Sequence, residues 1–126
     1  MAINDSDFLK FAVDCYRRND EIGFRNSISR SYYAIYHKSL ANVEMPDCTT
    51  NHHAALINYI DGLGNKNNQN MKEVARLLRL MRKARNDADY NLDVTMTDKL
   101  ALQNFKHCRL IDELWGQTLP EKRSTK

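Results

Sequence analysis

Long stretches without glycine or proline constrain the fold of this chain more than any other feature. Only four glycines and two prolines occur in 126 residues, so the chain has few positions at which a helix must end. No window shows a sustained alternation of apolar and polar residues, which is the pattern of a half-buried strand. The sequence therefore predicts an all-α protein, and its length is typical of a single domain.

Capping residues and apolar periodicity divide the chain into five predicted helices. These span approximately residues 6–19, 20–42, 50–64, 70–89 and 97–117. We expect Ser6 to cap the first helix, while Asn70 and Glu73 have the spacing of a capping box for the fourth. The second helix is apolar or aromatic around most of its circumference, which predicts a central position. Residues 1–119 are expected to form one domain, and the polar residues 120–126 a flexible tail.

Charge and cysteine content limit the classes of function. The net charge of +3 neither requires nor excludes a nucleic-acid partner. The three cysteines are widely spaced without a C-x-x-C pair, which argues against a disulfide framework and favours a cytoplasmic protein. No apolar stretch approaches 18 residues, so we expect no signal peptide and no membrane association. His52 and His53 are adjacent and would diverge by about 100° on a helix, so we predict neither a metal site nor a cofactor.

The fourth predicted helix carries an arginine on its apolar face. On a helical wheel the apolar residues share one arc, namely Val74, Leu77, Leu78, Leu80, Met81, Ala84 and Ala88. Arg85 falls inside this arc, with Asn86 beside it and Asp89 one turn further on. Because a buried arginine needs partners, Arg85 either forms an ion pair with Asp89 or binds phosphate in a cleft. Both hold together if Asp89 orients Arg85.

The opposite arc of the same helix is basic, with Lys72, Arg76, Arg79, Arg82 and Lys83. Such a stripe fits either a nucleic-acid backbone or an ordinary solvated helix face. On the second predicted helix, a polar and aromatic face contains Arg30, Tyr33 and His37. A histidine one turn from a tyrosine is a candidate acid–base pair. The alternative is that these side chains are core residues with satisfied polar groups.

Together, two segments resemble motifs of the HEPN domain (higher eukaryotes and prokaryotes nucleotide-binding). They read Ser-Arg-Ser-Tyr-Tyr-Ala-Ile-Tyr-His over residues 29–37 and Arg-Asn-Asp-Ala-Asp-Tyr over residues 85–90. Small stand-alone bacterial and archaeal HEPN proteins carry S-R-x-Y-Y-A-x-x-H and R-x-x-A-D-Y in this order. Residues 51–53 fall where relatives often place a histidine at the start of the middle helix. The resemblance implies a four-helix up-and-down bundle with a short additional helix, a homodimer and an RNA or nucleotide partner.

Many HEPN proteins are metal-independent endoribonucleases of toxin–antitoxin, CRISPR-associated and other antiphage systems, with an R-x4-6-H motif at the dimer interface. Here Arg85 and Asn86 begin that motif, but Tyr90 stands where histidine is expected, and a phenol is a poor base at neutral pH. The resemblance implies that Arg85 contacts the scissile phosphate and that Asn86 and Asp89 orient it. His37 and Tyr90 are the candidates for proton transfer. The expected RNA contacts are Arg30, Tyr33, Arg76, Arg79 and Arg82.

Two other interpretations stay open at this point. In the first, the chain is a non-catalytic HEPN partner, either antitoxin-like or paired with a small nucleotidyltransferase. Some such partners are modified on a tyrosine near this motif, and Tyr90 is the corresponding residue here. In the second, the polar cluster is an internal hydrogen-bond network of a purely structural helical bundle.

Overall fold

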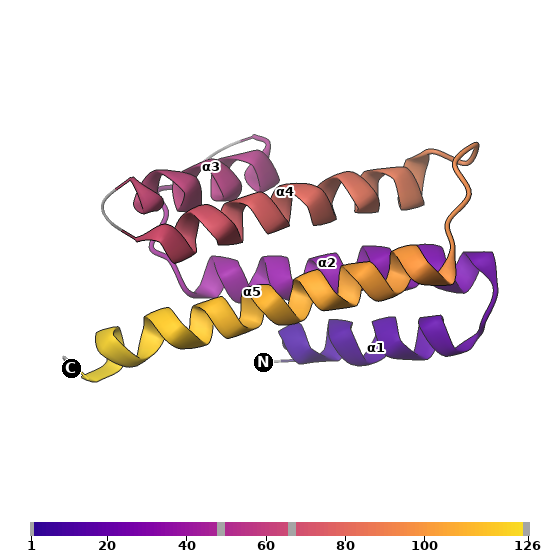
Figure 1. Ribbon diagram of the computed structural model, residues 1–126, viewed down its shortest axis with the longest axis horizontal. Helices are drawn as coiled ribbons and strands as arrows, with labels where there is room; N and C mark the ends of the chain where they lie inside the picture. The colour runs from indigo at the N-terminus through magenta and orange to yellow at the C-terminus, as the bar shows by residue number, and fades with distance from the viewer. Residues whose placement is uncertain (1, 48–49, 66–67, 125–126) are drawn as a thin grey trace.

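The computed structural model describes residues 2–47, 50–65 and 68–124, with side chains to residue 118, and these ranges contain five helices and no strand (Figure 1). The helices are α1 (Asp5–Arg17), α2 (Glu21–Ala41), α3 (His52–Gly64), α4 (Gln69–Tyr90) and α5 (Asp98–Ser124). The all-α prediction is confirmed. Figure 1 shows α1 and α2 as one antiparallel pair and α4 and α5 as another, with α3 alongside α4.

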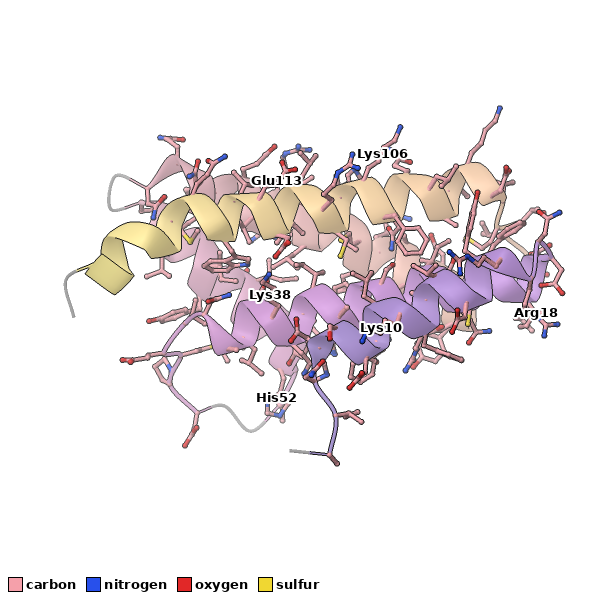
Figure 2. All side chains as sticks on the ribbon, turned by 90° about the horizontal axis from the view of Figure 1, so that it is seen from below. Lys10, Arg18, Lys38, His52, Lys106 and Glu113 are labelled. Atoms are coloured by element: carbon pink, nitrogen blue, oxygen red, sulfur yellow. The ribbon has the colours of Figure 1, made fainter. Side chains whose placement is uncertain are left out.

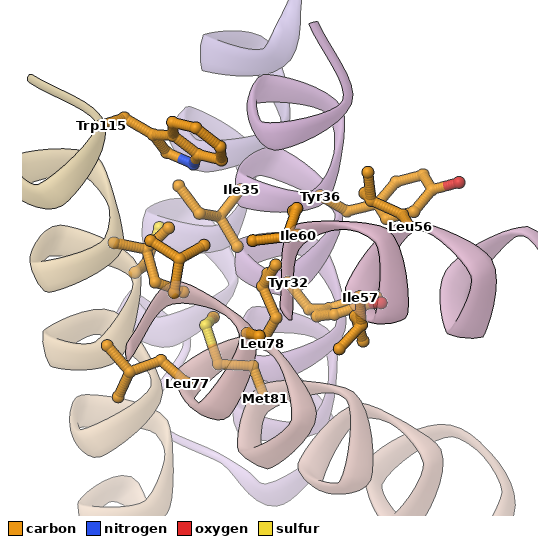
Figure 3. Packing of buried hydrophobic residues seen from close by; sticks show 14 of the residues in the cluster. Tyr32, Ile35, Tyr36, Leu56, Ile57, Ile60, Leu77, Leu78, Met81 and Trp115 are labelled. Carbon is orange, nitrogen blue, oxygen red and sulfur yellow. The ribbon is translucent and has the colours of Figure 1, made fainter. Parts of the chain in front are cut away.

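Helix α2 packs against α1, α4 and α5, in agreement with its predicted central position. The main core joins α2, α3, α4 and α5 (Figure 3), and its fully buried side chains include Tyr32, Leu56, Ile60, Leu78, Met81 and Ile111. Full burial of one such side chain stabilises the fold by roughly 2 kcal/mol. Charged side chains such as Lys10, Lys106 and Glu113 lie on the outer surface (Figure 2).

The contact between α2 and α5 also contains buried polar side chains. Asn104 Nδ2 donates hydrogen bonds to Ile28 O at 3.1 Å and to Ser31 Oγ at 3.2 Å. Trp115 Nε1 donates to Ser39 Oγ at 2.9 Å. Because buried polar groups are costly when unpaired, these bonds favour one register of α5 along α2.

Another buried polar residue, Arg25 of α2, binds the C-terminal end of α4. Its guanidinium donates to Glu21 Oε2 at 2.9 and 3.1 Å. It also donates to the backbone carbonyls of Asp87, Ala88, Asn91, Leu92 and Val94. The last carbonyls of a helix lack partners within the helix and carry a partial negative charge. Arg25 therefore holds the end of α4 and the following connection against α2.

The predicted start of the first helix is wrong in detail. Asn4, not Ser6, caps α1, because its side chain accepts from the Asp7 N–H at 3.3 Å. The Asp7 carboxylate accepts in return from the Asn4 N–H at 2.9 Å. This reciprocal pair satisfies two backbone donors and places negative charge at the helix start, which favours Asn4 over Ser6.

The predicted cap of the fourth helix is also wrong. Helix α4 begins at Gln69 after Asn68, so Asn70 lies in the first turn and does not cap it. At α5, Thr97, where the fifth helix was expected to begin, is the capping residue, since its Oγ1 accepts from the Leu100 N–H at 3.3 Å. Asp20, where the second helix was expected to begin, caps α2 through the Gly23 N–H.

Helix α5 extends to Ser124, beyond the expected end near residue 117. It therefore includes residues that we assigned to a polar tail. The residues after Pro120, namely Glu121, Lys122 and Arg123, have good helix propensity, and this favours continuation. None of the described helices combines the length and apolar character needed to cross a membrane.

The apolar arc of α4 is broader than the surface that its neighbours cover. Leu80, which we placed on this arc, is 44% exposed, and Leu100 at the start of α5 is 40% exposed. Arg85, in contrast, is buried as predicted. The helical wheel thus identifies the centre of a buried face better than its edges, because the edges depend on which helices pack there.

Candidate functional site

Arg85 of α4 lies against three tyrosine rings. The residue is 6% exposed. Its Cζ atom lies 5.6 Å from the ring centroid of Tyr32, 5.3 Å from that of Tyr33 and 6.0 Å from that of Tyr90. Such contacts stabilise a cation by about 0.5–2 kcal/mol each. They do so without supplying a hydrogen-bond acceptor, so the N–H groups of the guanidinium need other partners.

Asp89 only partly meets that need. Its Oδ2 lies 3.9 Å from Arg85 Nη1, which is beyond hydrogen-bond distance, and it accepts from Ser29 Oγ at 3.0 Å. Arg85 Nε is buried without a hydrogen-bond partner among the described residues. The ion pair predicted between Arg85 and Asp89 is present, but it leaves hydrogen-bonding capacity of the arginine unused.

The polar face of α2 lies beside Arg85, with Tyr33 as the common neighbour. Arg30 Cζ is 4.7 Å from the Tyr33 ring centroid, and its Nη2 donates to Ser29 Oγ at 3.1 Å. The His37 ring lies 6.3 Å from the Tyr33 ring and stacks on Phe8 of α1 at 5.2 Å. His37 is exposed and Tyr33 is partly exposed. Arg30 and His37 thus each lie against the Tyr33 ring, which contacts Arg85, and His37 reaches solvent.

His53, at the start of α3, lies in the same cluster, although it is not among the site residues predicted from the sequence. Its Nδ1 is 2.8 Å from Tyr32 Oη, and its ring centroid is 4.2 Å from that of Tyr36. In the sequence, its role was indicated only by the resemblance to HEPN domains, in which a histidine often stands at the start of the middle helix. No spacing rule within one helix could find it, because its partners are on α2 and α4.

The environment of His53 keeps the imidazole neutral. Burial, together with the positive charges of Arg85 and Arg82, lowers its pKa from 6.5 to about 4. Burial also raises the pKa of the Tyr32 hydroxyl, so that group stays protonated. In the tautomer in which the Tyr32 hydroxyl donates to Nδ1, the ring proton of His53 lies on Nε2, and that atom is then a hydrogen-bond donor.

The remaining predicted residues extend from this cluster along α4 as far as its last residue. Tyr90 is 75% exposed at the end of the helix. Arg82, Arg79 and Asn86 line a hollow between α3 and α4. Arg79 Nη2 also donates to Asn58 Oδ1 at 3.1 Å and lies 3.5 Å from Asp61 Oδ2. Arg79, Arg82, Asn86 and Tyr90 are all within six positions of Arg85 on α4, which is less than two helical turns.

Arg76 lies apart from the other predicted residues. It is nine positions before Arg85, which corresponds to about 13 Å along the axis of α4. Its Nε and Nη2 atoms donate to the two carboxylate oxygens of Glu73 at 2.6 and 2.8 Å. The structure does not bring Arg76 to the Arg85 cluster.

The cysteines and acidic residues do not add a second reactive centre to this site. Within the described ranges, no group of three or more His, Cys, Asp or Glu side chains is arranged to hold a metal ion. Cys15 and Cys108 are buried free thiols, and burial raises the pKa of both, to about 11 for Cys108. Cys48 lies outside the described residues.

Comparisons with protein-family models, with curated proteins and with solved structures find no match to this chain. The two sequence motifs and the geometry around Arg85 are therefore the basis for a functional proposal.

Proposed function

We propose that this chain is a HEPN-like four-helix up-and-down bundle, with α3 as the short additional helix, that binds RNA at Arg85 and cleaves it without a divalent metal. The proposal includes a cytoplasmic homodimer that belongs to a toxin–antitoxin or antiphage defence system. The supporting observation is the unused hydrogen-bonding capacity of buried Arg85. A closed internal network would satisfy this guanidinium, whereas a phosphate ligand would complete it.

Access to Arg85 is from the end of α4. Tyr90 and Asp89 both lie next to Arg85, and both reach solvent, with the Asp89 side chain 27% exposed. The planar guanidinium matches the geometry of two phosphate oxygens. A phosphodiester that approaches past Tyr90 therefore meets the terminal nitrogens of Arg85.

The reaction that fits this cluster is transesterification by the RNA itself. The 2′-oxygen attacks the adjacent phosphorus, and the bond from phosphorus to the 5′-oxygen breaks. His37 accepts the proton from the 2′-hydroxyl, and Tyr90 donates a proton to the leaving 5′-oxygen. Arg85 stabilises the negative charge that develops on the phosphoryl oxygens, and the Nε2–H of His53 offers a further hydrogen bond to them.

The test is RNA cleavage in the presence of a metal chelator. Wild-type protein is compared with Arg85→Ala and His37→Ala, all purified in parallel, and with Lys106→Ala, which removes an exposed cation of α5. We expect each of the first two variants to lose cleavage by about 100-fold or more, and the control to retain it. Cleavage that is equal in all four proteins, or absent from all, would contradict the enzymatic proposal.

The exposure of Tyr90 supports a second candidate function, that of a non-catalytic partner modified by a small nucleotidyltransferase or held by a cognate toxin or antitoxin. A hydroxyl on a 75% exposed tyrosine beside an arginine is accessible to a nucleotide-transferring enzyme. The measurement is the intact mass after co-expression with a nucleotidyltransferase encoded next to this chain. A nucleotide adduct that Tyr90→Phe abolishes supports this candidate. An unmodified protein that copurifies with no partner argues against it.

A further inference from the structure

A hollow of about 300 Å³ lies between α3 and α4, next to the Arg85 cluster. Its polar lining consists of Asn58, Arg79, Arg82, Lys83 and Asn86. Three of these side chains are cations, and no carboxylate is among the described residues that line it. The hollow therefore presents donors and positive charge and is suited to an anion.

Among the three cations of this hollow, Arg82 is the one with a buried nitrogen that lacks a partner among the described residues. Its Nη2 donates to Asn51 Oδ1 at 3.2 Å, but its Nε is buried without a hydrogen-bond partner among the described residues. An acceptor in the hollow lets this guanidinium gain a hydrogen bond by a small movement. Lys83, whose side chain is 78% exposed, pairs with Asp87 at 3.2 Å, and exposed pairs of this kind are weak.

The start of α3 adds to the positive potential. Asn51 precedes the helix with a φ of 51°, its side chain makes no capping bond, and the first turn contains no acidic residue. The partial positive charge of this 13-residue helix is therefore not offset at its own end. The lowered pKa of His53, to which Arg82 and Arg85 both contribute, is consistent with the same potential.

We infer that this hollow is a second phosphate subsite, which holds a neighbouring phosphate of the single-stranded RNA whose scissile phosphate lies at Arg85. The inference rests on the proposed function. Arg82 and Arg85 are three residues apart on α4, so they are neighbours on the helix surface with a rise of about 4.5 Å between them. The strand runs along α4 from Arg85 towards Arg79. The subsite supplies affinity and register, while the chemistry stays at Arg85.

The test measures binding separately from cleavage. A fluorescently labelled 2′-O-methyl RNA, which lacks the attacking hydroxyl, is titrated with protein at several salt concentrations. The hollow variants are Arg82→Gln and Lys83→Gln, and Arg85→Met tests the proposed function in the same assay. Lys106→Gln on α5 is the matched loss of one charge (Figure 2). The Lys83 side chain is 78% exposed, so Lys83→Gln keeps the test valid even if Arg82→Gln unfolds.

We expect each hollow variant to weaken binding on the order of tenfold. Each is also expected to reduce the slope of log affinity against log salt by about 0.7, which corresponds to one lost phosphate contact on a single strand. The KM for cleavage of ordinary RNA is expected to rise by a factor similar to the loss of binding, because the subsite supplies affinity.

Two results would overturn the inference, and they can be told apart. If the hollow variants bind like Lys106→Gln while Arg85→Met loses binding, the subsite is wrong and the proposed function stands. If wild type binds no RNA, or Arg85→Met binds as tightly as wild type, the proposed function fails and the subsite fails with it.

Discussion

Two arginines are buried near the C-terminal end of α4, where α2 packs against it, and they have opposite environments. Arg25 is 7% exposed and donates to a carboxylate and to five backbone carbonyls. Arg85 is 6% exposed, lies against tyrosine rings and has a buried Nε without a partner in the described chain. Burial is nearly the same for the two residues, so burial alone cannot separate a structural arginine from a binding one. The hydrogen-bond partners of the guanidinium do separate them.

This difference has a physical basis in the acceptor groups that each guanidinium satisfies. Arg25 satisfies carbonyl groups at a helix end that would otherwise lack donors. The carboxylate beside Arg85, that of Asp89, does not depend on it for a hydrogen bond, because it already accepts one from Ser29 Oγ. Removal of Arg25 therefore leaves unpaired polar atoms behind, whereas removal of Arg85 mainly removes a charge.

The largest expected effect on stability is that of Arg25→Met. Methionine keeps most of the packing but donates no hydrogen bond, so Glu21 and the carbonyls at the end of α4 lose their partner. We expect a loss of about 3–5 kcal/mol in the free energy of unfolding, measured by urea denaturation. A loss below about 1 kcal/mol would mean that water replaces Arg25 at the helix end.

The matched change at the second arginine, Arg85→Met, is expected to be much milder for stability. Because a buried charge is replaced by an apolar side chain of similar volume, the free energy of unfolding should fall by less than about 1 kcal/mol or rise. The same variant should lose RNA cleavage. A loss of a few kcal/mol with RNA binding intact would favour the purely structural network, since Asp89 would then be the residue left without its partner.

His53 offers an intermediate effect that appears as a pH dependence. Its pKa is about 4 in the folded chain against an ordinary 6.5, so between these values the unfolded state binds the proton and the folded state does not. Stability from this group is therefore complete above pH 6.5 and is lost as the pH falls towards 4. With allowance for partial exposure of the ring, this loss is on the order of 2 kcal/mol.

The matched variant His53→Gln removes this titration. Denaturation curves between pH 7 and 4 should show the wild type losing more stability than His53→Gln over that range. Parallel pH profiles for the two proteins would show that His53 titrates alike in the folded and unfolded chains.

The smallest effect on stability is expected at Tyr90. Tyr90→Phe keeps the ring beside Arg85 and removes only a hydroxyl on a residue that is 75% exposed, so unfolding should change by less than about 0.5 kcal/mol. Cleavage should nevertheless fall about 100-fold if the hydroxyl donates a proton to the leaving oxygen. A wild-type rate in Tyr90→Phe would remove Tyr90 from the chemistry and leave it as packing for Arg85.

The sequence predicted features that depend on one helix and missed those that depend on two. The five helices, the central position of α2 and the burial of Arg85 follow from periodicity and capping residues within single segments. Arg25 and Asn104 were missed because their acceptors lie on other helices. A wheel gives no sign that a polar residue will find a partner across a packing interface.

The same limit applies to the candidate site. The shared face of Arg30, Tyr33 and His37 could be seen on one helix, and so could the spacing of Arg85 and Asp89. The contact between Tyr32 and His53 could not, because it joins residues 21 positions apart on two helices. The separation of Arg76 from the cluster was hidden for the opposite reason, since a wheel shows direction around an axis and ignores distance along it.

The most direct measurement of the central claim is an NMR titration of the arginine Nε–H resonances with the 2′-O-methyl RNA. Arg85→Met and Arg25→Lys identify the two signals by their absence. We predict that the Arg85 resonance shifts on addition of RNA, because a phosphate bound at the terminal nitrogens changes the environment of the Nε–H, while the Arg25 resonance stays in place. RNA binding that leaves the Arg85 resonance unmoved, or that moves both equally, would contradict the account.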